Sequence, residues 1–128
     1  MAVILIVDDE ALIALAYQNA LKDAGHSVLM ASDGQRALDL LFDALPADGL
    51  PDAIITDYMM PRMDGAELVH AVRGDPRLAS VPIIMNTALS PDVIAAKHLP
   101  LDAVLYKPVD AGVLLRTVDR VLRQSSQT

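Results

Sequence analysis

The sequence predicts an α/β fold in which five strand–helix units build one parallel sheet. Three observations lead to this class. Short apolar segments bounded by turn residues recur five times, the segments between them repeat apolar residues at spacings of three and four, and 128 residues suit one domain. Such alternation favours a parallel sheet with helices on both faces and right-handed crossovers.

The predicted strands are continuous apolar runs rather than alternating patterns. Runs such as VILIV and AIIT are typical of parallel strands that are buried on both faces of a sheet. The five predicted strands cover residues 3–7, 27–31, 53–56, 82–85 and 103–106.

A helix is expected after each strand. Apolar stripes within 37–42 and 66–72 mark the second and third helices, and Asp64 is the expected N-cap of the third. The fourth helix is expected to begin at Ser90 and Pro91, and Asp110 is the expected cap of the fifth. The first ends at Gly25, and its expected core-facing stripe is Ile13, Ala16, Tyr17, Ala20, Leu21 and Ala24. Residues 45–52 are expected to form a loop, and 124–128 a flexible tail after a domain spanning 1–123.

Composition excludes several classes of function. The formal net charge is −7, which argues against direct binding to nucleic acid. The absence of cysteine excludes disulfides, thiolate metal sites and cysteine nucleophiles. The longest apolar run, residues 2–7, is too short to span a membrane and has no basic leader, so a cytoplasmic domain without membrane contact is expected.

Polar side chains gather where the predicted strands end. Asp8 and Asp9 follow the first strand, Asp57 follows the third, Thr87 follows the fourth and Lys107 follows the fifth. Because ligands bind at the carboxyl ends of the strands in open parallel sheets, these groups are expected to form one site.

The chemistry of this set indicates a phosphoryl site with a bound cation. Three carboxylates packed together repel one another, and a divalent cation relieves that repulsion. An all-oxygen ligand set points to Mg²⁺ or Mn²⁺ rather than zinc. A lysine and a threonine hydroxyl suit phosphoryl oxygens, and a carboxylate is available as the nucleophile.

The ordered motifs resemble those of response-regulator receiver domains of two-component signalling. The matching residues are Asp8-Asp9, the segment from Asp57 to Gly65 (DYMMPRMDG), Thr87-Ala88 and Lys107-Pro108, and the resemblance covers roughly residues 2–123. It implies the flavodoxin-like (βα)5 fold, with strand order 2-1-3-4-5.

The resemblance also implies a role for each site residue. Asp57 is the phosphoacceptor, Lys107 pairs with the phosphoryl group and Thr87 is the switch hydroxyl. The expected Mg²⁺ ligands are Asp9 and Asp57 directly, Asp8 mainly through water, and the backbone carbonyl of Met59.

Three features depart from the simplest pattern. The switch aromatic of the family usually lies three residues before the lysine, where this sequence has Val104; Tyr106, on the same strand face, either replaces it or serves as a docking aromatic. Asn86 is a polar residue where an apolar strand is expected to finish. Leu12 and Leu15 lie off the first helical stripe, as scattered surface leucines or as a docking patch for a partner helix.

We therefore expect a stand-alone receiver, monomeric or weakly dimeric, rather than an enzyme. It would accept a phosphoryl group from a histidine kinase or histidine phosphotransfer protein onto Asp57, with Mg²⁺, and switch a surface over its fourth helix, fifth strand and fifth helix for a downstream protein target. Two alternatives remain open. One is a Mg²⁺-dependent aspartyl-phosphate phosphatase or phosphotransferase, which usually carries an acid where this chain has Met59; the other is a docking module that is never phosphorylated.

Overall fold

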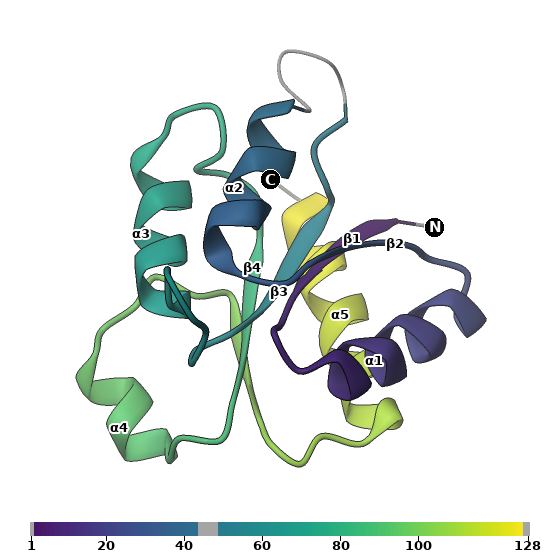
Figure 1. Ribbon diagram of the computed structural model, residues 1–128. Helices are drawn as coiled ribbons and strands as arrows, with labels where there is room; N and C mark the ends of the chain where they lie inside the picture. Colours follow the sequence, from purple (N-terminus) through teal and green to yellow (C-terminus); the bar gives the residue numbers. More distant parts are fainter. Residues whose placement is uncertain (1, 44–48, 127–128) are drawn as a thin grey trace.

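The computed structural model describes residues 2–43 and 49–126, which form a three-layer α/β/α sandwich (Figure 1). Five parallel strands are ordered β2-β1-β3-β4-β5, as expected for the flavodoxin-like arrangement. The strands are β1 (Val3–Val7), β2 (Ser27–Ala31), β3 (Ala53–Asp57), β4 (Ile83–Thr87) and β5 (Ala103–Tyr106). The helices are α1 (Ala11–Asp23), α2 (Gly34–Asp43), α3 (Gly65–Gly74), α4 (Pro91–Ala96) and α5 (Ala111–Ser126).

The two faces of the sheet carry separate apolar cores, which explains the uninterrupted apolar strands. In β1, Leu5 and Val7 pack toward α2, α3 and α4, whereas Ile4 and Ile6 pack toward α1 and α5. Successive side chains of a strand point to opposite faces, so a strand covered on both sides needs apolar residues at every position. The central strand β3 is accordingly buried along its whole length.

The expected strands are confirmed, but β3 and β4 run further toward their carboxyl ends than expected. Asp57 is the last residue of β3 and Thr87 the last of β4, so both are held by the sheet itself. Asn86 also lies within β4, where it pairs in register with Asp57. This extension places the polar side chains on rigid backbone at the edge of the sheet.

The helix boundaries follow the local signals in the sequence. Asp64 is the N-cap of α3 and forms a reciprocal capping box with Glu67, and Ser90 caps α4 ahead of Pro91. Gly25 adopts a φ of 96° after α1, a left-handed conformation that glycine tolerates at a helix end.

The expected inward face of α1 is wrong in part, and α5 extends into the expected tail. On α1, Ala16 and Ala24 are exposed and Ala14 is buried, so the inward face is rotated relative to the expected stripe, while Leu12 and Leu15 are exposed as expected. Moving an alanine side chain between water and the protein interior changes its free energy little, so alanines define the inward face of a helix only weakly. Helix α5 continues through Ser126, since no glycine or proline follows Gly112 in its first turn, so residues 124–126 of the expected tail are helical.

Some expectations fall outside what the structure describes. The expected loop at 45–52 lies partly in the undescribed segment 44–48, and residues 127–128 of the expected tail are also undescribed. Among the described residues, no helix is long and apolar enough to cross a membrane.

Candidate functional site

The candidate site lies at the carboxyl edge of the sheet, where β1, β3, β4 and β5 end. The structure brings together the side chains of Asp8, Asp57 and Lys107, and it places Thr87 at the end of the strand between β3 and β5. Asp8, Asp57 and Thr87 are all buried, whereas Asp9 is exposed at the mouth of the site.

Three carboxylates form a compact acidic cluster. One oxygen from each of Asp8, Asp9 and Asp57 lies within 4.8 Å of the others. Burial, reinforced by the charge of Asp57 and partly opposed by the Glu10 N–H and by Lys107, raises the pKa of Asp8 from 3.8 to about 6. Burial also raises the pKa of Asp57, although Lys107 opposes that change. The cluster is therefore short of positive charge, and its oxygen-only donor set fits a hard divalent cation.

Local backbone geometry fixes the direction of the two buried carboxylates. One oxygen of Asp8 accepts a hydrogen bond of 2.8 Å from the backbone N–H of Glu10. One oxygen of Asp57 accepts a bond of the same length from the backbone N–H of Tyr58. Each side chain thus folds over the turn that follows its own strand, and its second oxygen faces Lys107.

Lys107 is the cation of the site. Its Nζ donates to Asp57 Oδ2 at 3.2 Å and to Glu10 Oε1 at 3.1 Å, and it lies 3.9 Å from Asp8 Oδ2. Burial lowers the pKa of Lys107, but the three carboxylates more than offset this effect and raise it above its ordinary value. The lysine is therefore charged and held directly beside Asp57 at neutral pH.

Thr87 and Lys107 are joined through the backbone. The N–H of Lys107 donates to the carbonyl of Thr87 at 2.8 Å, which ties the ends of β4 and β5 together. The Thr87 hydroxyl accepts a 3.1 Å bond from the N–H of Leu89, at the start of the loop to α4. A change at Thr87 would thus act on both β5 and the α4 loop.

Met59 lies in the loop that follows β3. Its side chain is 67% exposed, and Met59 and Asp9 line the same open hollow beside the acidic cluster. Among the residues expected to be Mg²⁺ ligands, Met59 is the one outside the carboxylate cluster, and its expected contribution is its backbone oxygen.

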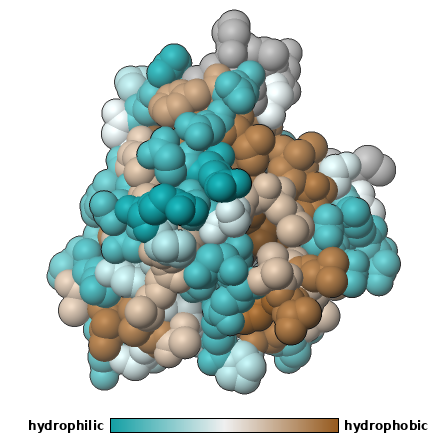
Figure 2. Space-filling model, viewed as in Figure 1, coloured by the Kyte–Doolittle hydropathy of each residue, from teal (hydrophilic) through white to brown (hydrophobic). Residues whose placement is uncertain are grey.

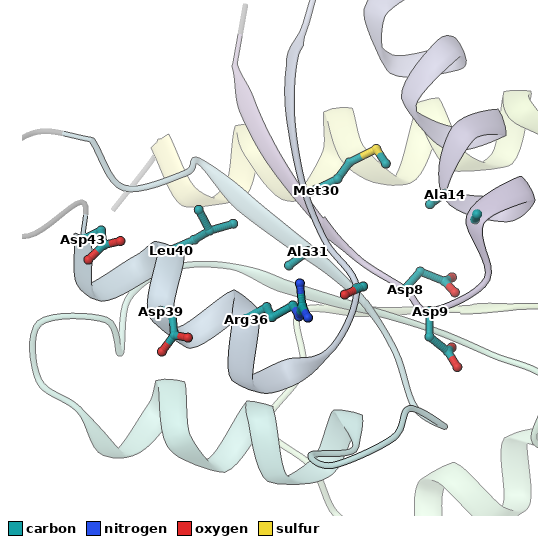
Figure 3. Close-up of a pocket in the computed structure, with 11 residues that line it drawn as sticks. Asp8, Asp9, Ala14, Met30, Ala31, Arg36, Asp39, Leu40 and Asp43 are labelled. Carbon is teal, nitrogen blue, oxygen red and sulfur yellow. The ribbon is translucent and has the colours of Figure 1, made fainter.

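A groove leads away from the acidic cluster along β2 and α2 (Figure 3). It encloses about 540 Å³, with Asp8 and Asp9 at one end and Asp39 and Asp43 of α2 toward the other. Figure 2 shows hydrophobic surface on the side of the molecule where α1 and β2 lie, and the exposed apolar residues of these elements are Leu12, Leu15, Leu29 and Met30.

Sequence reasoning missed or left undecided three polar contacts. Glu10, the N-cap of α1, pairs with Lys107 across 97 residues. Asn86 is buried and hydrogen-bonds Tyr17 through its side chain, while its amide oxygen has no partner in the described part of the chain. Asp33, unremarked in the sequence, is fully buried and paired with Arg62; a distant partner leaves no local signal.

Comparison with known proteins agrees with this geometry. The family model of the response regulator receiver domain matches residues 4–119. The chemotaxis protein CheY of Pseudomonas aeruginosa is 34% identical over 94% of this chain and 96% of its own. The ycf27 protein of Guillardia theta is 37% identical over 97% of this chain but 46% of its own, so the chain spans about half the length of that relative.

A solved structure extends the agreement to the fold. The signal receiver domain of a signal transduction histidine kinase from Syntrophus aciditrophicus superposes with a TM-score of 0.87 and 33% identity, covering 100% of this chain and 95% of that domain. The chain belongs to the response regulator receiver domain family.

Proposed function

We propose that this chain is a signalling phosphoacceptor that takes a phosphoryl group onto Asp57. The observation that carries the proposal is the position of the Lys107 ammonium, 3.2 Å from Asp57 Oδ2, at the edge of a cluster with two further carboxylates. A buried carboxylate beside a lysine and a potential cation site has the parts that phosphoryl transfer needs.

The donor is a phosphohistidine of a histidine kinase or a histidine phosphotransfer protein. An oxygen of Asp57 attacks the phosphorus, the O–P bond forms as the N–P bond breaks, and the electron pair of that bond stays on the imidazole nitrogen, which takes up a proton. Lys107 then balances the charge of the new acyl phosphate. Slow autodephosphorylation ends the signal, because water accepts the phosphoryl group from Asp57.

A Mg²⁺ ion fits the donor set of the site. Asp9 and Asp57 would hold it directly, Asp8 through water and Met59 through its carbonyl oxygen, and the ion supplies positive charge that screens the phosphoryl oxygens from the carboxylates. The raised pKa of Asp8 supports this assignment, because burial, with the nearby charge of Asp57, disfavours the ionised carboxylate unless a cation compensates it.

Two surfaces beside the site suit protein partners. Leu12, 83% exposed, and Leu15 project from α1 close to the acidic turn and would pack against a helix of the phosphodonor. On another face, Val93 of α4, Tyr106 of β5 and Val113 of α5 are exposed, and a downstream target would read the phosphorylated state there.

An experiment on the whole chain tests the proposal. Incubation with a small phosphodonor such as acetyl phosphate and Mg²⁺, followed by intact mass spectrometry, should show the gain of one phosphoryl group. The gain should be absent without Mg²⁺ and absent in Asp57→Asn. An unmodified wild-type mass would favour the docking module, whereas steady multiple-turnover release of phosphate from added phosphoesters would favour a phosphatase.

A further inference from the structure

The loop between β3 and α3, residues 58–64, contributes Met59 to the candidate site. Its two ends are closed by a bond of 2.7 Å from the N–H of Gly65 to the carbonyl of Tyr58. Gly65 is required for this closure, because an added Cβ would collide with the Asp57 carbonyl oxygen and lie 2.8 Å from Tyr58 Cα. The residues between these two ends, from Met59 to Asp64, need a separate anchor.

Arg62 provides such an anchor outside the loop. Its Nη2 and Nε donate to the same oxygen of Asp33, at 2.6 and 3.1 Å. Asp33 directly precedes α2, and its other oxygen accepts a 2.9 Å bond from the N–H of Arg36 in the first turn of that helix. The Asp33 carboxylate is fully buried, while the Arg62 side chain is 64% exposed and lies over it from the surface.

Two further features indicate that this contact defines the loop conformation. Arg62 has a φ of 67°, in the left-handed region that arginine rarely occupies, and its paired hydrogen bonds offset the cost of that conformation. The next residue, Met63, packs directly on the start of α2, since a Cβ on Gly34 would lie 2.8 Å from Met63 Cγ. Two consecutive loop residues therefore dock on the turn before α2.

We propose that the Arg62–Asp33 pair is a positioning clamp that fixes the β3–α3 loop, and with it the backbone of Met59, beside Asp9. Arg62 and Asp33 do not touch the phosphoryl group or the cation; they act through the loop. This inference rests on the proposed function, because it assigns the clamp to the completion of the Mg²⁺ site. Outer partners that orient metal ligands typically change metal affinity by ~10–100-fold when they are removed.

Three variants of the full chain separate positioning from general stability. Arg62→Met keeps the aliphatic stem and removes the donors, and Arg62→Lys restores one charged donor. Arg36→Met is the matched control, because Arg36 also pairs with Asp33, at 3.6 Å, but belongs to α2 rather than to the loop. All three changes are at largely exposed side chains, so the fold should survive them.

The measurements are Mg²⁺ affinity by calorimetry and the amide NMR spectrum of the metal-free protein. We expect Arg62→Met to weaken Mg²⁺ binding by about tenfold, Arg62→Lys to recover part of the loss, and Arg36→Met to stay within about twofold of wild type. The amide signals of residues 58–64 should shift or broaden in Arg62→Met, while those of α5 stay in place.

The outcomes distinguish the clamp from the proposed function. Wild-type Mg²⁺ affinity in a folded Arg62→Met protein overturns the clamp, and so do equal losses in Arg62→Met and Arg36→Met. Failure of wild-type protein to gain a phosphoryl group, with Mg²⁺ binding intact, overturns the proposed function and leaves the comparison of variants valid.

Discussion

Replacing Asp8 by asparagine should make the metal-free protein more stable, although it removes a residue of the site. Burial holds the pKa of Asp8 at about 6 in the folded chain, against 3.8 for an ordinary aspartate. Between those pH values the folded state binds a proton that the unfolded state has lost. The contribution of Asp8 to the free energy of unfolding of the wild type therefore falls as pH rises from about 4 to about 6 and levels off above that range.

The size of the effect follows from the shift. A difference of ~2 pKa units at 1.36 kcal/mol per unit corresponds to about 3 kcal/mol when Asp8 is fully ionised. Asparagine is neutral and retains the oxygen that accepts the bond from the Glu10 N–H. We expect the free energy of unfolding of Asp8→Asn to exceed that of the wild type by about 2–3 kcal/mol above pH ~7. The difference should be about half as large near pH ~5 and small near pH ~4.

Urea unfolding with a chelator present, at three pH values, measures the difference. Asp9→Asn is the control, because Asp9 belongs to the same cluster but is exposed, and its replacement should change the stability much less. Added Mg²⁺ should stabilise the wild type and so reduce the difference in free energy of unfolding between it and Asp8→Asn. Either of two results would refute the argument that burial of this charge destabilises the fold: a stability gain in Asp8→Asn that does not vary with pH, or a stability loss in Asp8→Asn above pH ~7.

Three further expectations concern other parts of the chain. Gly65→Ala should lower the free energy of unfolding by about 2 kcal/mol, since its Cβ would meet the backbone of Asp57, whereas Gly74→Ala, with nothing within 4 Å, should raise it by about 0.5 kcal/mol; denaturant titration compares the pair. Lys107→Ala should still accept a phosphoryl group but lose the beryllofluoride-induced amide shifts over α4 and α5, and an unchanged shift pattern would contradict the role of the lysine. Tyr106→Ala should weaken binding of a downstream target by about 1–2 kcal/mol, in the phosphorylated state alone if the ring is part of the switch and equally in both states if it is a docking aromatic.

The architecture and the acidic cluster were predictable because both depend on short-range signals and one general rule. Apolar runs identified all five strands, and the carboxyl ends of parallel strands necessarily share an edge of the sheet. Asp8, Asp57 and Lys107 therefore meet although 99 residues separate the first from the last. The rule needs only the order of the elements, not the details of packing.

Contacts between loops were beyond the same reasoning. Asp33 has the sequence context of an ordinary N-cap, and it does cap α2, but nothing nearby indicates that Arg62 covers its other oxygen. The prediction of the inward face of α1 was wrong for a different reason. Ala14 and Ala16 are equally small, so the pattern could not decide which of them faces the sheet, and the packing of Tyr17 and Leu21 sets the rotation of the helix.

The end of β5 shows how register refines a pattern that the sequence left open. Val104 lies opposite Met85 in the ladder and packs against the core beneath α2, α3 and α4, while Tyr106 lies opposite Thr87 and is 39% exposed. The aromatic ring is therefore level with Thr87 rather than two residues deeper in the sheet. The bond from the Lys107 N–H to the Thr87 carbonyl joins the two strands at this same level. A displacement of Thr87 would thus reach β5 first at Tyr106 and Lys107, which is why the state dependence of Tyr106→Ala distinguishes a switch from a docking surface.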